Sequence, residues 1–248
     1  MIIKGLQKTT LLDYPGKISC TIFISGCNFH CPFCHNKELV FEQSGKDLKI
    51  YSEEEIFNFL KTRIGKLEAV CLTGGEPTIY PELIPFIKKI KSLGFLIKLD
   101  SNGTNSKMVE KLINGKLVDY IAIDYKGPFT KYSNYTNKTN IQISNLKKTI
   151  EILLRSEIAF ELRTTVVPTL HTKEDLIQMA KGIENLIIEN SLKIVNCKLK
   201  IIWYLQQFRP KHCLDSKFEK ITPYSDKWFD EVRKELRLYP INVKLRGN

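Results

Sequence analysis

Residues 26–36 read GCNFHCPFCHN and place Cys27, Cys31 and Cys34 at a C-x3-C-x2-C spacing. Three thiolates this close together on one loop can ligate three irons of a [4Fe–4S] cluster, whose usual protein ligands are cysteine sulfurs. No fourth cysteine follows within the loop, so one iron would lack a protein ligand. An open coordination position is typical of catalytic rather than structural metal centres. The spacing therefore predicts a cluster that binds a substrate.

Zinc is the alternative to iron, and its possible ligands in this loop are Cys27, His30, Cys31, Cys34 and His35. Structural zinc sites usually combine two ligand pairs that lie a dozen or more residues apart. Cys197 and Cys213 are distant in the chain and do not form a C-x-x-C pair. The spacing therefore favours the iron–sulfur cluster over a zinc knuckle.

The composition is that of an ordinary globular protein. The chain has 248 residues, of which 43% are hydrophobic and 26% are charged, and this length suits one domain of α/β-barrel size. The first residues show no signal-peptide pattern, and no apolar run reaches the roughly 18 residues of a membrane span. We therefore expect a cytoplasmic protein that is not bound to a membrane and keeps its thiols reduced. Cys20 and Cys71 lie in apolar runs and are expected to be buried thiols.

The chain is basic, with a net charge of +11 from 38 Lys and Arg against 27 Asp and Glu. A basic balance can indicate a nucleic-acid or an acidic protein partner. However, 31 of the 38 basic residues are lysines, scattered singly or in short pairs. Base and phosphate recognition favours arginine. The pattern thus favours solvated lysines over a nucleic-acid groove.

Short apolar runs alternate with helical patterns, which predicts βα units around a parallel sheet. The expected strands are Ile18–Ser25, Glu68–Thr73, Phe95–Asp100, Tyr120–Asp124, Phe160–Val167 and Lys198–Leu205. The expected helices are Ser52–Thr62, Pro81–Ser92, Ser106–Ile113, Ser144–Leu154, Lys173–Ile188 and Ser225–Leu236. Ser52 followed by Glu55 predicts a capping box, and Pro81 suits the first turn of a helix. Six such units are fewer than the eight of a full barrel.

Polar runs follow these strands at their carboxyl ends, where barrel enzymes keep their functional residues. The cysteine loop follows the first strand, and Thr73-Gly74-Gly75-Glu76-Pro77 ends the second. Asp100-Ser101-Asn102-Gly103 ends the third, and Asp124-Tyr125-Lys126 ends the fourth. The run from Arg163 to Pro168 forms the fifth strand. This arrangement predicts one functional face.

The cysteine motif, with Phe33 before its third cysteine, and the GGEP run together resemble the signatures of the radical SAM enzymes. The resemblance implies an α/β fold, a partial (β/α)6 TIM-like barrel with an open side. It also implies that S-adenosylmethionine (SAM) chelates the open iron and is cleaved by the reduced cluster to methionine and a 5′-deoxyadenosyl radical. In this reading the protein positions SAM and no general base is required.

The same resemblance assigns expected roles to the other runs. Carbonyls of Gly74 and Gly75 would receive the SAM ammonium, and Glu76 would hold the loop or add negative charge. The sequences LDSNG, IDYK and LRTTVVP resemble those of glycyl-radical-enzyme activases. By that likeness, the expected ligands of a monovalent cation are Asp100, Ser101 and Asp124, Lys126 and Arg163 bind the SAM carboxylate, and Asn102 belongs to the same site. Phe33 and Val167 are expected to pack on adenine, or alternatively to be core residues.

The opening GLQKTTLLDYPGKISC and the close LQQFRP…VKLRG resemble most the activating proteins of anaerobic ribonucleoside-triphosphate reductase. This implies one domain, 1–248, with a cluster loop at 26–36 and a C-terminal extension over about 206–248. It implies as partner a glycyl radical enzyme, whose C-terminal glycine loop loses a hydrogen atom, and as electron donor a flavodoxin or ferredoxin. The alternatives are an activase of the pyruvate formate-lyase type, a radical SAM enzyme that modifies a small molecule or RNA, and a non-enzymatic iron–sulfur or zinc module.

Overall fold

The computed structural model describes residues 1–43, 47–190 and 201–246. In this part of the chain, eight strands are hydrogen-bonded in chain order: β1 Ile3–Thr10, β2 Ser19–Ile24, β3 Ala69–Gly74, β4 Leu96–Ser101, β5 Tyr120–Asp124, β6 Ala159–Val166, β7 Ile201–Gln207 and β8 Ile241–Arg246. β1 is antiparallel to β2. The series β2–β3–β4 and β6–β7–β8 are parallel. The predicted α/β class, with a mostly parallel sheet, is confirmed.

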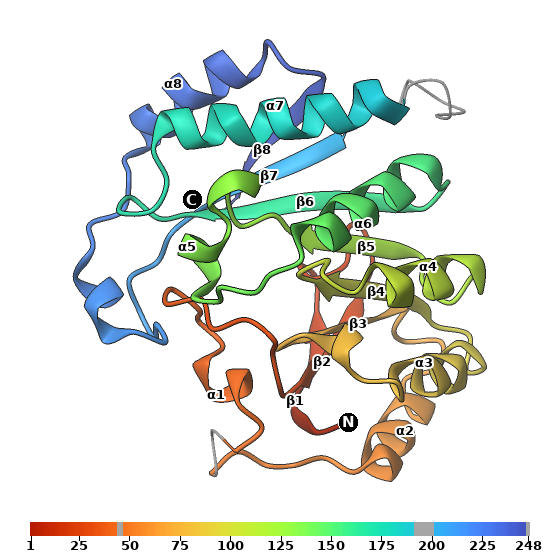
Figure 1. Ribbon diagram of the computed structural model, residues 1–248. Coiled ribbons are helices and arrows are strands. Elements are labelled where there is room, and N and C mark those ends of the chain that lie inside the picture. The colour runs from red at the N-terminus through yellow and green to blue at the C-terminus, as the bar shows by residue number, and fades with distance from the viewer. Residues whose placement is uncertain (44–46, 191–200, 247–248) are drawn as a thin grey trace. The chain divides into compact units, whose positions relative to one another are not determined.

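Helices connect most of the strands (Figure 1). They are α1 Lys37–Val40, α2 Glu53–Lys61, α3 Leu83–Lys91, α4 Ser106–Asn114, α5 Ser133–Thr136, α6 Ile143–Arg155, α7 Lys173–Asn190 and α8 Asp226–Leu236, with short 3-10 turns η1 Pro77–Ile79, η2 Phe129–Lys131 and η4 Ser216–Lys220. All six expected helices are present within two residues of their predicted ends. Pro81 is an exception in detail, because α3 begins at Leu83 with Glu82 as its N-cap, so the proline precedes the first turn. Among the described residues, no helix is long and apolar enough to span a bilayer.

The first of two compact units comprises Met1–Asn28, Asn36–Ser101 and Lys107–Ala122. Its core is built by strands β2 to β4, whose inward apolar side chains are fully buried: Ile22, Ile24, Leu72, Ile97 and Leu99. Helix α2 begins at the predicted capping box, in which Ser52 and Glu55 exchange hydrogen bonds. Helices α2 and α3 of this unit turn apolar side chains inward, including Ile56, Leu60, Phe86 and Ile90, as their sequence period requires.

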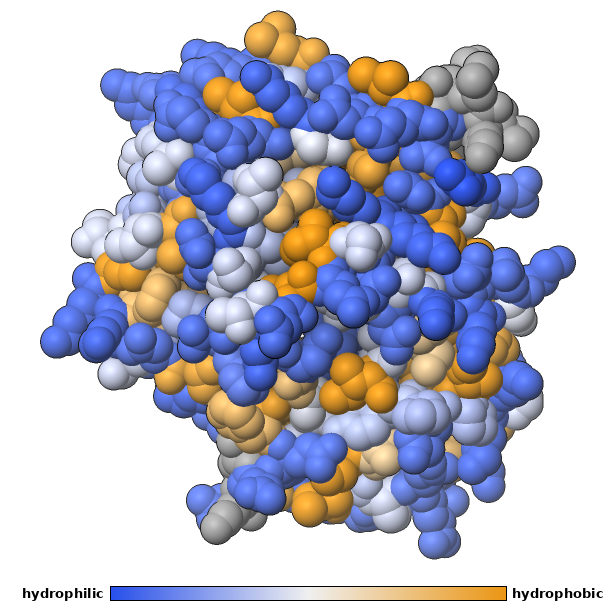
Figure 2. All heavy atoms as spheres, in the orientation of Figure 1, coloured by the Kyte–Doolittle hydropathy of each residue, from blue (hydrophilic) through white to orange (hydrophobic). Residues whose placement is uncertain are grey.

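The second unit comprises Phe29–His35, Asn102–Ser106 and Ile123–Asn248. Strands β6, β7 and β8 pair in parallel, and Leu162, Trp203 and Leu205 are buried in its core. Helices α7 and α8 pack side by side (Figure 1). Figure 2 shows that hydrophilic residues predominate on their visible surface. The exposed faces are therefore solvated, and the apolar stripes of both helices supply the core.

Two strands were not expected from the sequence. β1 has the burial pattern of an edge strand, exposed over Gln7–Thr9, and its glycine and lysines obscure any alternation. β8 lies at the other end of the strand order and is only partly buried. Positions 198–200 of the expected strand Lys198–Leu205, and Cys197, lie outside the described residues. The single domain expected for 1–248 stays a prediction.

Candidate functional site

The first cysteine of the 26–36 loop, Cys27, is held by hydrogen bonds from its segment to helix α1, which follows the loop. The amide of Gly26 donates to the carbonyl of Leu39 over 2.7 Å, and the amide of Cys27 donates to that of Val40 over 2.9 Å. Leu39 and Val40 belong to helix α1 and are buried. The backbone of Cys27 is therefore fixed by main-chain bonds within the first unit.

The other two cysteines belong to the second unit. The amide of Cys34 donates to the carbonyl of Cys31 over 3.0 Å, which closes a tight turn. Burial raises the pKa of the Cys31 thiol to about 11, although the nearby Lys126 ammonium lowers it. A thiol must lose its proton to ligate iron. Ligation by Cys31 would therefore depend on positive charge supplied by the metal and by Lys126.

A segment that follows β7 contacts the cysteine loop. The amide of Leu214 donates to the carbonyl of Cys34 over 3.0 Å, and the amide of Asp215 donates to that of Pro32 over 2.9 Å. We call residues 208–218 the loop clamp. It fixes the third cysteine from a part of the chain for which the sequence predicted no contact with the cysteine loop.

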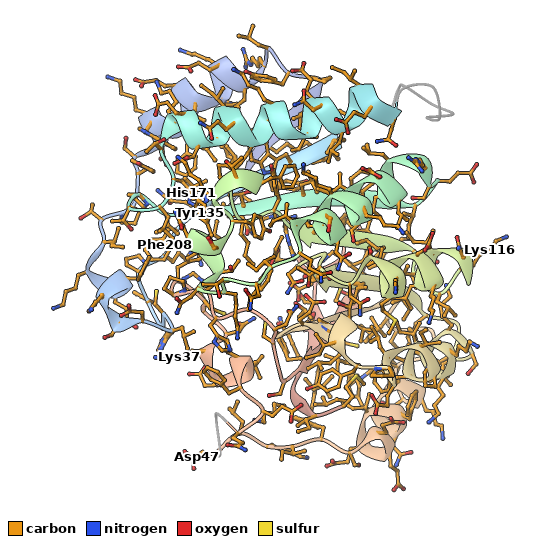
Figure 3. The ribbon with its side chains drawn as sticks, viewed as in Figure 1. Lys37, Asp47, Lys116, Tyr135, His171 and Phe208 are labelled. Carbon is orange, nitrogen blue, oxygen red and sulfur yellow. The ribbon has the colours of Figure 1, made fainter. Side chains whose placement is uncertain are left out.

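Aromatic rings add to the loop clamp. The ring of His35 stacks on that of Phe208 (labelled in Figure 3), with centroids 6.0 Å apart, and its Nε2 donates to the carbonyl of Arg209 over 2.7 Å. Phe33 is buried, and its ring centroid is 6.5 Å from that of Phe218. A protein contact thus contributes to the burial of Phe33, and its contact with adenine stays a prediction.

The two glycines at the end of β3 pack against the strand that precedes the cysteine loop. Gly74 has a φ of +122°, and a Cβ on Gly75 would lie 2.0 Å from the carbonyl oxygen of Gly26. The amide of Gly75 donates to the carbonyl of Ile24 over 2.7 Å, and the carbonyl of Gly74 accepts from Asn36 Nδ2 over 3.1 Å. Backbone packing therefore requires this glycine pair. Its contact with a SAM ammonium stays a prediction.

Glu76 is a buried carboxylate that organises the turn after β3. Its Oε1 accepts from the amide of Thr78 over 3.1 Å and from Ser101 Oγ over 2.8 Å. It also accepts from the hydroxyl of Thr78. Glu76 therefore ties the GGEP turn to the end of β4, which agrees with one of its two expected roles, that of holding the loop.

Asp100 has a cationic partner that sequence reasoning missed. The Lys98 ammonium forms an ion pair with Asp100, and Lys98 is only 2% exposed. The signal was available, because residues two apart on a strand lie on the same face. Asn102, by contrast, is a turn residue, since its Oδ1 accepts from the amide of Thr104 over 3.0 Å. Cation binding by Asp100 and Ser101 stays a prediction.

Asp124, at the end of β5, lies between two cations. Its Oδ2 is 3.2 Å from Lys126 Nζ, and its Oδ1 is 3.1 Å from Arg163 Nη2. Burial alone would raise the pKa of Asp124, but Lys126 and Arg163 outweigh burial and hold it below its ordinary value. Burial also disfavours the Lys126 ammonium, yet Asp124 and the neighbouring cysteines raise its pKa. Asp124, Lys126 and Arg163 therefore form one cluster of ionised side chains.

The backbone around Asp124 is held by hydrogen bonds that the sequence did not predict. The amide of Tyr125 donates to the carbonyl of Arg163 over 2.8 Å. The hydroxyl of Tyr132 donates to the carbonyl of Asp124 over 3.2 Å and accepts from the amide of Lys126 over 3.1 Å. Thr164 Oγ1 donates to the carbonyl of Tyr125. No local sequence signal predicts these contacts: those of Arg163 and Thr164 depend on how β5 and β6 pair, and those of Tyr132 on the path of the chain after β5.

The side chains present fit the predicted cofactors. Among the described residues, no group of three or more His, Cys, Asp or Glu side chains is arranged around a single metal ion. The three loop thiols are nevertheless the donors that iron–sulfur clusters use. The ammonium of Lys126 and the guanidinium of Arg163 are donors that suit a carboxylate. Ser25 directly precedes the cysteine loop. Its hydroxyl is buried and has no hydrogen-bond partner within the described part of the chain.

Comparison with known families and proteins adds three relatives. Residues 21–182 match the model of the Radical SAM superfamily. A proposed glycyl-radical enzyme activating enzyme of Methanocaldococcus jannaschii is 32% identical, over 99% of this chain and 95% of that protein. The pyruvate formate-lyase-activating enzyme of Clostridium pasteurianum is 28% identical over 74% of this chain and 76% of its own length. The anaerobic ribonucleoside-triphosphate reductase-activating protein of Escherichia coli is 37% identical, but over 32% of this chain and 51% of its own.

Among solved structures, the chain is similar to Streptococcus suis SuiB bound to precursor peptide SuiA. The TM-score is 0.62 at 16% sequence identity, over 91% of this chain and 48% of that one. The chain thus spans about half the length of that structure. At this level of identity the likeness concerns the fold.

Proposed function

Because the chain belongs to the radical SAM superfamily, we propose that this radical SAM enzyme activates a glycyl radical enzyme, the anaerobic ribonucleoside-triphosphate reductase. The observation that carries the proposal is the 32% identity to the M. jannaschii protein along nearly the whole chain. The choice of reductase rests on the opening and closing sequences quoted above. It is supported by the 37% identity to the E. coli activating protein, which extends over 80 residues.

Cys27, Cys31 and Cys34 would hold the [4Fe–4S] cluster. Lys126 and Arg163 would bind the SAM carboxylate, because both are cationic, lie side by side at Asp124 and carry the donors that carboxylates accept from. When bound, the cluster and SAM supply the one-electron chemistry that removes a hydrogen atom from glycine. The other proposed cofactor contacts come from Phe33, Gly74, Gly75, Glu76, Asn102 and Val167.

A monovalent cation beside the SAM carboxylate remains part of the proposal, with Asp100, Ser101 and Asp124 as ligands. Lys98 and Lys126 already place an ammonium beside each aspartate. A cation would therefore have to displace or adjoin these pairs. SAM affinity that is higher in potassium chloride than in choline chloride of equal ionic strength would support the cation; equal affinities would remove it.

The partner is proposed to present its C-terminal glycine loop, and the electron donor to be a flavodoxin or ferredoxin. The net charge of +11 would favour an acidic donor. The second candidate is a pyruvate formate-lyase partner, which the likeness to the C. pasteurianum enzyme over 74% of this chain favours.

The test is an anaerobic activation assay. The protein is reconstituted with iron and sulfide, reduced, and mixed with SAM and either the reductase or pyruvate formate-lyase. Electron paramagnetic resonance records the glycyl radical, and chromatography measures 5′-deoxyadenosine. A glycyl doublet with the reductase supports the proposal, and a doublet only with the lyase supports the second candidate. Deoxyadenosine without either doublet would redirect the search to a small-molecule or RNA substrate.

A further inference from the structure

His171 is a buried histidine that the assignments above do not use. It lies in the turn between β6 and α7 and has no exposed surface. The amide of Val167 donates to its Nδ1 over 3.0 Å, and its Nε2 is 2.9 Å from the carbonyl oxygen of Lys126. His171 therefore connects the segments that follow β5 and β6, each of which carries a residue assigned to SAM.

Only one form of the imidazole satisfies both hydrogen bonds. A backbone amide can only donate, so Nδ1 must be unprotonated; a carbonyl can only accept, so Nε2 must carry the proton. His171 is therefore the neutral Nε2–H tautomer. Burial lowers the pKa of His171 to about 4, more than its two backbone hydrogen bonds and Asp175 raise it. The neutral form consequently persists at physiological pH.

The surroundings fix both the ring and the main chain of His171. The ring of Tyr135 lies beside it, with centroids 4.7 Å apart (Figure 3). The hydroxyl of Tyr135 donates to the carbonyl of Leu170 over 3.0 Å, and that of Tyr224 donates to the carbonyl of His171 over 2.8 Å. The imidazole can therefore act as a rigid spacer between its two partners.

The peptide groups of Lys126 are held on both sides. Its amide donates to the Tyr132 hydroxyl and its carbonyl accepts from His171. The direction of the Lys126 side chain toward Asp124 therefore depends on this pair of contacts. At the other end, the bond from His171 sets where the backbone of Val167 leaves β6.

We propose that His171 is a positioning residue of the SAM site, which holds Lys126 and Val167 at the separation that the two ends of one SAM molecule require. The inference rests on the proposed function for the identity of the ligand. The histidine contacts backbone groups and not SAM, so its effect is on geometry. Partners that orient metal-ligating side chains change metal affinity about 10- to 100-fold when removed, and we take the lower end of that range as the measure for His171.

Three variants separate the two hydrogen bonds. His171→Asn places an acceptor near the Nδ1 position for Val167, and His171→Gln places a donor near the Nε2 position for Lys126. His171→Phe keeps an aromatic ring beside Tyr135 and removes both bonds. Tyr224→Phe is the matched control, because it removes hydrogen bonds to the carbonyls of Pro168 and His171 in the same turn but leaves the imidazole bonds intact.

The readouts are the Kd for SAM on cluster-loaded, unreduced protein, iron content, and amide exchange at Val167. We expect His171→Phe to raise the Kd about 10-fold at full iron content, with faster exchange at Val167 and smaller effects of Asn and Gln. Tyr224→Phe should lower stability and leave the Kd unchanged. If the Phe variant does not fold, the Asn and Gln variants decide.

Lys126→Ala distinguishes a failure of the positioning role of His171 from a failure of the proposed SAM site. Unchanged SAM affinity in all His171 variants, with weaker binding by Lys126→Ala, would overturn the role of His171 alone. Unchanged affinity in Lys126→Ala would overturn the SAM-site assignment of the proposed function, and the positioning role with it.

Discussion

At the residue scale, charged side chains at the strand ends are stabilised by close partners of opposite charge. Asp100 is paired with the buried Lys98, and Asp124 lies between Lys126 and Arg163. A carboxylate taken out of water is costly unless it is paired and hydrogen-bonded. These pairs therefore place ionised groups at the strand ends without an unpaired buried charge.

Asp124→Ala should weaken SAM binding and spare the cluster. Without the carboxylate, Lys126 and Arg163 repel each other and lose their common orientation. We expect SAM affinity to fall about tenfold, equivalent to about 1.4 kcal/mol. The pairs at the 37%-exposed Asp124 are screened by solvent, so unfolding free energy should fall by only about 1 kcal/mol. Equilibrium binding and urea denaturation measure the two effects.

Asp119→Ala is the control for this prediction. Asp119 forms a comparable pair with Lys91 at 2.9 Å and accepts from the amide of Ile97 over 2.7 Å. Its loss should reduce stability and leave SAM affinity unchanged. Equal SAM affinity in Asp124→Ala and the unaltered protein would remove Asp124 from the site.

His171 should make stability dependent on pH below neutrality. Its pKa is lowered to about 4 from an ordinary 6.5. Between pH 4 and pH 6.5, His171 is therefore protonated in the unfolded chain and neutral in the folded chain. The contribution of His171 is therefore complete above pH 6.5 and falls as the pH drops toward 4, by up to about 3 kcal/mol. Urea denaturation of the protein and of His171→Gln should show a stability difference that shrinks over this range. A constant difference would contradict the prediction.

At the element scale, the loop clamp gives the segment after β7 a defined structural role. Residues 208–218 supply two main-chain hydrogen bonds and two ring contacts to the second half of the cysteine loop. The loop lies between β2 and the short helix α1. Order in this loop therefore depends on a segment about 180 residues further along the chain.

Leu214→Pro should loosen the cysteine loop, because proline has no amide hydrogen to donate to Cys34. We expect a loss of about 1 kcal/mol in unfolding free energy and a several-fold faster loss of cluster absorbance in air. Leu214→Ala retains the amide and is the matched control. Similar cluster lifetimes in the two variants would show that this hydrogen bond does not protect the cluster.

At the scale of the whole molecule, the predicted radical SAM fold is confirmed and extended. The six expected strands are β2 to β7, and the described chain adds β1 and β8 at the ends of the strand order. Both additions are less regularly apolar than the inner strands. Because the hydrophobic signal of a strand reflects its burial, such end strands are the hardest to predict.

Cys31→Ala should abolish the cluster and SAM cleavage while the chain stays folded, since a cluster with two protein thiolates lacks an essential ligand. Cys71→Ala is the control, because Cys71 is a buried thiol of β3 outside the loop. Iron analysis, visible absorbance and circular dichroism measure the outcome. Normal cluster absorbance in Cys31→Ala would refute its assignment as a ligand.

The sequence by itself determined the class of fold, most elements and the kind of cofactor. Hydrophobic period, the Ser52 capping box and the spacing of Cys27, Cys31 and Cys34 are local properties, legible within a dozen residues. The position of Asp124 at the end of an apolar strand singled it out, and the resemblance to the activases gave Lys126 and Arg163 their expected roles. Neither could state that they pair with one another.

Those pairings were decided only by the tertiary structure. Asp124 accepts a hydrogen bond from Arg163, which is 39 residues away in the chain. The carbonyl of Lys126 accepts one from His171, which is 45 residues away. The carbonyl of Cys34 accepts a hydrogen bond from the amide of Leu214, about 180 residues further along the chain. Such contacts depend on the register of neighbouring strands and on the path of the loops that join them. A one-residue shift of either strand would turn these side chains to the opposite face, and no local pattern encodes that register.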